Sequence, residues 1–325
     1  MARCGGKACY AASVVLAVSA PLAFAQEQYP VRPVRVVVAF APGGGTDIVA
    51  RSLSARLAAR FGQQFVVDNR PGGGGVTGIE LVARAQPDGY TLLIVSSSFA
   101  ANAALRKTSY DPINGFQPIS LLSRQALLLL VHPSVPVNNV KELIALARAS
   151  PGKISYGSTG IGNVTHLSIE MLQAQHGVKL IHVPYKGAGP ATVDVVGGQI
   201  PLAVVSVTGA LPHVRSGRLK SLFVTSKQRA AVLPDVPTVG ELGMPQIEHT
   251  TSWFGVLAPA RTQKSVIARL NDDIVTAIGM PDVQARLIGQ GLDPVTTTAD
   301  EFAAIIKSDI ARWAKVVKEA GIRAE

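Results

Sequence analysis

Short apolar runs rich in β-branched residues alternate along the chain with longer stretches in which apolar positions recur three or four residues apart. Residues 34–40 form a run that is apolar apart from Arg35, which predicts a buried strand. In the next stretch, Val49, Leu53 and Leu57 lie four apart and the pattern ends at Gly62, which predicts a helix over residues 48–61 with a glycine stop. This alternation predicts an α/β fold with mainly parallel sheets.

The same two patterns continue to the end of the chain. Further strands are predicted at residues 65–67, 91–95, 127–131, 154–156, 180–183, 202–206, 222–225 and 254–257. Further helices are predicted at residues 79–85, 140–149, 164–176, 190–196, 264–278, 283–290 and 299–320. Open α/β sheets bind ligands at the loops that follow the carboxyl ends of their strands, so functional residues are expected in those loops.

The composition indicates a folded protein of about two domains. Of the 325 residues, 47% are hydrophobic and only 16% are charged, which excludes a disordered chain. The formal charge is +10, but lysine and arginine are scattered singly, without the basic run interleaved with aromatic residues that a nucleic-acid site requires. We therefore expect no nucleic-acid partner. The charge indicates either a mild attraction for anions or merely a solvated surface.

Residues 1–25 have the pattern of a secretory signal peptide. Arg3 and Lys7 form a positive start, residues 11–24 are apolar, and an Ala-Phe-Ala sequence directly precedes Gln26. A short membrane anchor is the weaker alternative, because fewer than the ~18 residues needed to span a bilayer are continuously apolar. We therefore expect cleavage before Gln26 and export to the periplasm.

Both cysteines, Cys4 and Cys9, lie within this signal. Its removal leaves 300 residues without cysteine and lowers the formal charge from +10 to +8. Disulfides, thiolate nucleophiles and cysteine-bound metals are therefore excluded from the exported protein. The longest later apolar run, residues 126–131, is too short to cross a membrane.

The loop after the first predicted strand is the first candidate site. It consists of Phe40, Ala41, Pro42, Gly43, Gly44, Gly45, Thr46 and Asp47. Three glycines let a ligand approach the backbone, and the free N–H groups of the helical turn that follows favour an anion. The P-loop pattern is absent, because no Gly-Lys-Ser/Thr follows the glycines. The structural alternative is a tight turn in which Thr46 or Asp47 caps the helix.

A second glycine-rich loop, residues 69–78, contains the G-x-G-x-x-G spacing at Gly73, Gly75 and Gly78. Four consecutive glycines satisfy that spacing by chance. The following strand ends in three serines at residues 96–98, with no acidic residue to bind a ribose. Dinucleotide binding is therefore not expected, and no cofactor is predicted.

Two more loops join a predicted strand to a predicted helix. The loop at residues 156–163 carries Ser158 and Thr159, whose hydroxyls suit hydrogen bonding to ligand oxygens, although ordinary helix capping is an equal alternative. A nucleophile elbow is not predicted, because tyrosine stands two residues before Ser158 where glycine is required. The loop at residues 183–190 carries Lys186, which either faces an anionic ligand or extends into water.

No metal site or catalytic constellation is evident. The histidines show no H-E-x-x-H or other ligand spacing; they are His132, His166, His176, His182, His213 and His249. Of these, His166 lies one turn into the helix that follows the third loop, close enough to belong to a site. Asp47 is the only acid in these loops, so no pair of catalytic carboxylates is predicted. A hydrolase that uses Ser158 or Ser97 with His166 is a minor alternative.

Backbone donors without a nucleophile or metal ligands indicate a binding site rather than an active site. Each hydrogen bond to a charged ligand contributes about 1.5–3 kcal/mol, whereas association costs about 4–15 kcal/mol. One loop therefore holds a small anion poorly, and loops from two facing lobes hold it well. The sequence predicts a two-lobed clamp that closes on its ligand.

Six ordered motifs resemble the Bug/TctC family of periplasmic solute receptors from tripartite tricarboxylate transporters. They lie at residues 39–47, 69–75, 110–112, 156–160, 183–187 and 233–238. The resemblance implies a monomeric, non-enzymatic α/β protein of the Venus-flytrap type. In that family two lobes close over a small carboxylate held mainly by backbone amides and waters. The implied partners are the membrane subunits of such a transporter or, alternatively, a membrane sensor protein.

By this resemblance, residues 26–127 and 254–325 form the first lobe and residues 128–253 form the second. The implied ligand-binding residues are Phe40, Ala41, Pro42, Gly43, Gly44, Gly45, Thr46, Asp47, Ser96, Ser97, Ser158, Thr159, Gly160, Gly162, Asn163, His166, Tyr185, Lys186, Gly187 and Val205. Many relatives carry acids where this chain has Pro201 and Val205. We therefore expect a purely carboxylic or aromatic acid rather than a ligand with an amino group.

Overall fold

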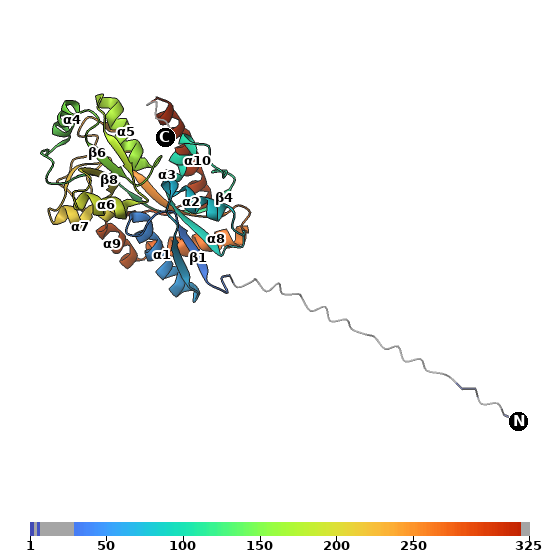
Figure 1. The fold of residues 1–325 in the computed structure, drawn as a ribbon. Helices are drawn as coiled ribbons and strands as arrows, with labels where there is room; N and C mark the ends of the chain where they lie inside the picture. Colours follow the sequence, from blue (N-terminus) through green and yellow to red (C-terminus); the bar gives the residue numbers. More distant parts are fainter. Residues whose placement is uncertain (3–4, 7–28, 320–325) are drawn as a thin grey trace.

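The computed structural model describes residues 1–2, 5–6 and 29–319, so the predicted signal sequence lies almost entirely outside the described residues. The described residues form two β-sheets flanked by helices (Figure 1). This confirms the predicted two-sheet α/β class. Within the described residues, no helix combines the length and the apolar character needed to cross a membrane.

The first sheet has the strand order β11-β4-β10-β3-β1-β2. Its strands are β1 (Val34–Val38), β2 (Phe65–Asn69), β3 (Thr91–Ser96), β4 (Phe116–Gln125), β10 (Ser252–Pro259) and β11 (Asp293–Pro294). Strand β1 runs parallel to β2 and β3, whereas β10 runs antiparallel to both β3 and β4. Val34, Val36 and Val38 enter one apolar cluster and Val37 enters another, so β1 is apolar at every position except Arg35, which pairs with Asp68.

The second sheet has the order β7-β6-β8-β5-β9. Its strands are β5 (Leu127–Val131), β6 (Ser155–Ser158), β7 (Ile181–Pro184), β8 (Leu202–Ser206) and β9 (Lys220–Val224). Strand β6 is parallel to β7 and β8, but β5 is antiparallel to β8 and β9. Both sheets are therefore mixed but mainly parallel, as predicted: β1 to β4 run in one direction against β10 and β11, and β6 to β9 run in one direction against β5. Apolar runs predict that a strand is buried on both faces, but they do not fix its direction.

The helices mostly follow the predicted pattern. They are α1 (Gly45–Phe61), α2 (Val76–Ala83), α3 (Ser98–Leu105), α4 (Val140–Ala149), α5 (Val164–His176), α6 (Ala188–Val196), α7 (Val207–Arg215), α8 (Lys264–Gly279), α9 (Pro281–Gly289) and α10 (Ala299–Glu319), with 3-10 turns η1 (Gly73–Gly75) and η2 (Pro245–Thr250). Helices α3 and α7 were not predicted, because α3 is short and rich in alanine and α7 contains Pro212. Helix α1 begins at Gly45, three residues earlier than expected, so the glycine-rich loop continues directly into its first turn.

The long C-terminal helix α10 contacts structure from both sheets. Phe302 lies in an apolar cluster with strands of the first sheet. Trp313 lies in a cluster with strands of the second sheet and with Ala100 and Ala101 of α3. Figure 1 shows α10 beside α3, and the two helices are in contact. Helix α10 therefore joins the two halves of the molecule on the side where the chain passes from β4 to β5.

Candidate ligand-binding site

A cavity of about 40 Å³ lies between the two sheets. Its lining comes from both of them and consists of Phe40, Gly44, Gly45, Thr46, Ser96, Leu127, Thr159, Asn163, Val164, Thr165, Ala188, Ser206, Ser252 and Phe254. One water needs roughly 10–15 Å³ by this kind of measure, so the space suits about three water-sized groups. That is the size of one carboxylate group.

Four helices present their N-termini to this cavity. Gly45 begins α1, Val164 begins α5 and Ala188 begins α6, while Ser206 is the residue directly before α7. The first N–H groups of a helix have no partner within the helix, and the helix dipole places partial positive charge there. The four N-termini come from both sheets. Together they favour an anion without any cationic side chain.

The side chains that line the cavity carry hydroxyl, amide or apolar groups, and among the described lining residues none is charged. Thr46 and Thr159 were expected from their loops and Ser96 from the family resemblance, and all three are buried. The cavity also receives Ser206 and Ser252, which were not among the predicted binding residues. A hydroxyl can donate a hydrogen bond, so these side chains can donate to either oxygen of a carboxylate.

Several lining residues were missed by the sequence analysis for identifiable reasons. They are Leu127, Val164, Thr165, Ala188, Ser206, Ser252 and Phe254. Ser206 ends strand β8, so the rule that ligands bind at strand ends could have found it. Ser252 and Phe254 begin strand β10, which runs antiparallel to its neighbours and therefore brings its opposite end to the cavity.

Asp47 does not line the cavity but stabilises the first loop through hydrogen bonds. It is only 4% exposed and accepts hydrogen bonds from the Gly43 backbone N–H at 3.1 Å and the Asn69 side chain at 3.0 Å. Its carboxylate also pairs with Arg51 at 3.0 Å. Burial disfavours ionisation, but these donors outweigh it, and the pKa of Asp47 is lowered. Asp47 therefore stays ionised as an anchor for the glycine turn.

The first loop, which follows β1 of the first sheet, also contacts the loop at residues 183–190, which follows β7 of the second sheet. The Ala41 backbone N–H donates to the Lys186 carbonyl at 3.0 Å. A Cβ placed on Gly187 would lie 3.0 Å from the Ala41 nitrogen, and one placed on Gly189 would lie 2.6 Å from the carbonyl of Pro42. Ala41, Pro42, Lys186 and Gly187 thus form backbone contacts between the sheets beside the cavity, and the Lys186 side chain is exposed.

Tyr185 is part of the fourth loop, residues 183–190, and its side chain contacts α6. Its hydroxyl donates to the Asp194 carboxylate at 2.6 Å. Burial and this carboxylate raise the pKa of Tyr185 to about 12, so the hydroxyl remains a donor. The structure therefore places Tyr185 in the support of the loop and not among the residues that line the cavity.

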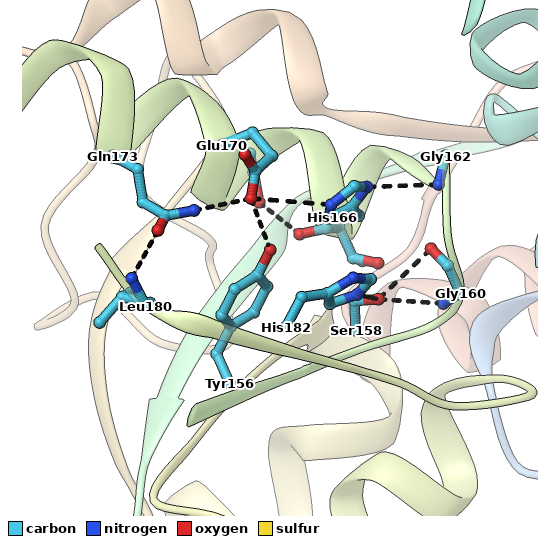
Figure 2. A network of polar contacts seen from close by, with 11 residues as sticks. Tyr156, Ser158, Gly160, Gly162, His166, Glu170, Gln173, Leu180 and His182 are labelled. Atoms are coloured by element: carbon cyan, nitrogen blue, oxygen red, sulfur yellow. Dashed lines mark hydrogen bonds and ion pairs between the residues drawn. The ribbon is translucent and has the colours of Figure 1, made fainter. Parts of the chain in front are cut away.

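The third loop is supported by a network of polar contacts (Figure 2). Ser158 Oγ lies 2.6 Å from His182 Nε2 and accepts the Gly160 N–H at 3.1 Å. The Gly162 N–H donates to His166 Nδ1 at 3.3 Å. Ser158, Gly160, Gly162 and His166 thus shape the loop from which Thr159 and Asn163 reach the cavity. His182, which the sequence analysis did not single out, is central to this support.

The two histidine rings in this network are stacked, with centroids 4.0 Å apart. Burial, followed by the charges of His182 and Arg106, lowers the pKa of His166 to about 3. Burial also lowers the pKa of His182 to about 4. His166 Nε2 lies 3.6 Å from the Glu170 carboxylate, which also accepts the Tyr156 hydroxyl (Figure 2). Both histidines are therefore neutral at neutral pH.

The hydrolase alternative required Ser158 or Ser97 to be paired with His166. The structure pairs Ser158 with His182 instead, and Ser158 is fully buried. Ser97 Oγ lies 3.3 Å from Ser252 Oγ. Within the described residues, no group of three or more His, Cys, Asp or Glu side chains is placed to hold a metal ion.

Positions 201 and 205, where many relatives carry acids, lie at different distances from the cavity. Pro201 precedes β8, whereas Ser206 at the other end of that strand lines the cavity. Five residues of strand span about 17 Å, so an acid at position 201 would not reach the ligand directly. Val205 is fully buried in an apolar cluster that includes Ala188. The expectation about amino-group ligands therefore depends on position 205 alone.

The fold, with a cavity between two mixed α/β sheets, is that of periplasmic binding proteins. More specifically, the chain belongs to the tripartite tricarboxylate transporter receptor family, whose family model matches residues 49–322. This family and fold are those of periplasmic solute receptors rather than of enzymes.

Three solved structures are similar over nearly the whole chain. The periplasmic binding protein BugD is 36% identical with a TM-score of 0.88, over 91% of this chain and 100% of that one. An R. palustris protein with adipate is 36% identical with a TM-score of 0.87, over 91% of this chain and 99% of that one. MatC from Rhodopseudomonas palustris, with bound malate, is 33% identical with a TM-score of 0.85, over 89% of this chain and 100% of that one.

Proposed function

We propose that this receptor binds a small carboxylate in the cavity between its two sheets and delivers it to a tripartite tricarboxylate-type transporter. The observation that carries the proposal is the convergence of four helix N-termini on a cavity lined by uncharged groups. Their backbone N–H groups supply donors and partial positive charge, so a carboxylate is stabilised without a salt bridge.

The similar structures support the same ligand class. One contains adipate and another contains malate, and both ligands are small dicarboxylates. A cavity that suits one carboxylate group accounts for one end of such a ligand. The ligand's second end then lies toward loops that part when the lobes open, which is how a clamp admits and releases its ligand.

We assign the lobes as the sequence analysis expects, with residues 26–127 and 254–325 in the first and residues 128–253 in the second. The distribution of strands supports this assignment, because β1 to β4, β10 and β11 build the first sheet and β5 to β9 build the second. Helix α10 contacts both sheets, so its final turns are a shared element. Cleavage before Gln26 and a monomeric state are part of the same proposal.

Native mass spectrometry of the protein, purified from the periplasm without unfolding, tests the function. We expect one bound small carboxylate per monomer and an N-terminus at Gln26. Recovery of a cationic or neutral ligand, or turnover of a supplied ester, would contradict the proposal. Co-purification of the membrane subunits with the loaded protein, but not with the stripped protein, tests the delivery step.

A further inference from the structure

Arg106 connects the two sheets beside the proposed ligand site. It is the residue directly after α3, a helix that follows strand β3 of the first sheet. Its Nη2 donates at 2.5 Å to the backbone carbonyl of Ile161, which lies in the loop after strand β6 of the second sheet. The same nitrogen donates to Asn102 Oδ1 at 3.1 Å, so the guanidinium is held by its own helix while it reaches the other sheet.

The loop opposite α3 is shaped to receive this arginine. Gly162 has a φ of +74°, and a Cβ at that position would lie 2.7 Å from Arg106 Nη2 and 2.8 Å from Asn102 Oδ1. Any side chain at position 162 would therefore meet the end of α3. The close approach of helix and loop depends on glycine there.

A second contact lies beside this one. The Asn102 side-chain amide donates to the Gly74 carbonyl at 2.9 Å. A Cβ on Gly74 would lie 2.5 Å from the carbonyl oxygen of Ile161, the same oxygen that Arg106 binds. The glycine-rich turn η1, helix α3 and the loop after β6 therefore meet at one carbonyl group.

The contact biases the arrangement of the lobes without locking it. A charged donor forms a stronger hydrogen bond to a carbonyl than a neutral donor does. However, Arg106 Nε is buried without a hydrogen-bond partner among the described residues, which costs free energy while the lobes are together. The unpaired Nε thus offsets part of the favourable hydrogen bond, so the lobes can still separate and release the ligand.

The loop that Arg106 holds is the one that carries Thr159 and Asn163 to the cavity. On its other side the loop is fixed by His166 through Gly162 and by His182 through Ser158 (Figure 2). Arg106 supplies the restraint from the opposite sheet. Its contact exists only when the two sheets lie together as they do in this structure.

We propose that Arg106 is a positioning residue that latches the 158–163 loop to the first sheet and thereby favours the ligand-binding arrangement of the lobes. This inference rests on the proposed function, because it assumes that the lobes separate and close. It assigns the latch to one side chain that does not line the cavity, so a test can separate its failure from failure of the receptor function.

The test measures lobe separation and ligand affinity in the same variants. The exported protein has no cysteine, so V66C and V193C place one spin label on β2 of the first sheet and one on α6 of the second, at side chains 53% and 68% exposed. Pulsed dipolar spectroscopy then gives the distance distribution with and without adipate. Titration calorimetry with adipate and malate gives the affinity, and thermal unfolding verifies that each variant is folded.

We expect Arg106→Met to reduce the ratio of close to separated molecules, and the affinity, by at least tenfold, about 1.4 kcal/mol. Arg106→Lys, which keeps a charged donor, should recover a large part of both. Arg84→Met, which removes a positive charge from an exposed position directly after α2, should change neither.

Distance distributions and affinities in Arg106→Met that match those of Arg84→Met would overturn the latch, as would an Arg106→Lys variant as impaired as Arg106→Met. If the unmodified protein binds neither adipate nor malate, the proposed ligand class is in question. The ligand-free distance distributions still decide whether Arg106 holds the lobes together.

Discussion

Gly74 gives a direct test of whether ligand binding requires contact between the two sheets. A Cβ at Gly74 would lie 2.5 Å from the carbonyl oxygen of Ile161 in the other sheet's loop. Ordinary carbon-to-oxygen contacts are about 3.3 Å or longer. The substitution Gly74→Ala therefore requires the loop to move away by about 0.8 Å.

The neighbouring glycine provides a matched control. Gly73 and Gly74 both have positive φ angles, +57° and +68°, so alanine introduces similar backbone strain of about 1–2 kcal/mol at either position. A Cβ on Gly73 would meet only the Cβ of Val76, at 3.4 Å and within its own turn. The two variants should therefore lose similar amounts of stability and differ in ligand binding.

Overpacking of this size costs about 1–3 kcal/mol. The clash arises only when the sheets lie together, so the cost falls on the bound state and weakens binding by about 5- to 150-fold. Titration calorimetry with the carboxylate recovered from the protein, together with urea unfolding, measures both quantities. Equal affinities for Gly73→Ala and Gly74→Ala would refute the reasoning, because the contact at Ile161 would then have no bearing on binding.

Three further perturbations follow from the site. Asp47→Ala removes the acceptor of the Gly43 and Asn69 donors, so it should lower the free energy of unfolding by about 2–4 kcal/mol and the ligand affinity at least tenfold. The lost ion pair with Arg51 adds little, because Arg51 is half exposed. A change in the free energy of unfolding of less than ~0.5 kcal/mol, measured in urea, would show that Asp47 does not anchor the loop. His166 and His182 take up protons near pH 6.5 in the unfolded chain but only near pH 3 and pH 4 in the folded protein. The free energy of unfolding should therefore fall as the pH drops below 6.5, by up to about 1.4 kcal/mol per pH unit for each histidine. If the His166→Gln, His182→Gln double variant loses stability between about pH 6.5 and 4.5 as steeply as the unmodified protein, this explanation is wrong. Gly45→Ala places a Cβ 2.8 Å from the Phe254 ring and should lower the free energy of unfolding by about 1–3 kcal/mol. Gly279→Ala, in open space at the end of α8, should instead raise it by up to about 1 kcal/mol. Thermal unfolding measures both, and an unchanged stability of Gly45→Ala would mean that the cavity wall moves easily.

The parts of the site that the sequence predicted are those that follow a strand and precede a helix. Phe40, Gly44 and Gly45 after β1, and Thr159 and Asn163 after β6, all line the cavity. Glycine and hydroxyl residues between a strand and a helix N-terminus are readable from the sequence because their role is local.

Other parts depend on the direction of strands and on long-range packing. Phe254 reaches the cavity because β10 returns antiparallel to β3, and an apolar run does not encode that direction. His182 supports Ser158 from a neighbouring strand 24 residues away, and no local pattern connects the two. Asp47 was expected in the site, but it faces Asn69 and Arg51 beneath the loop, because the first helical turn begins at Gly45.

The central claim is that uncharged groups from both sheets hold a carboxylate. Titration calorimetry that compares each bound carboxylate with its neutral amide tests this claim most directly. Adipate, malate and the acid recovered from the protein are the ligands to compare, each beside its amide. The helix N-termini predict that a carboxylate binds at least tenfold more tightly than its amide, about 1.4 kcal/mol. Equal or tighter binding of the amides would contradict the account.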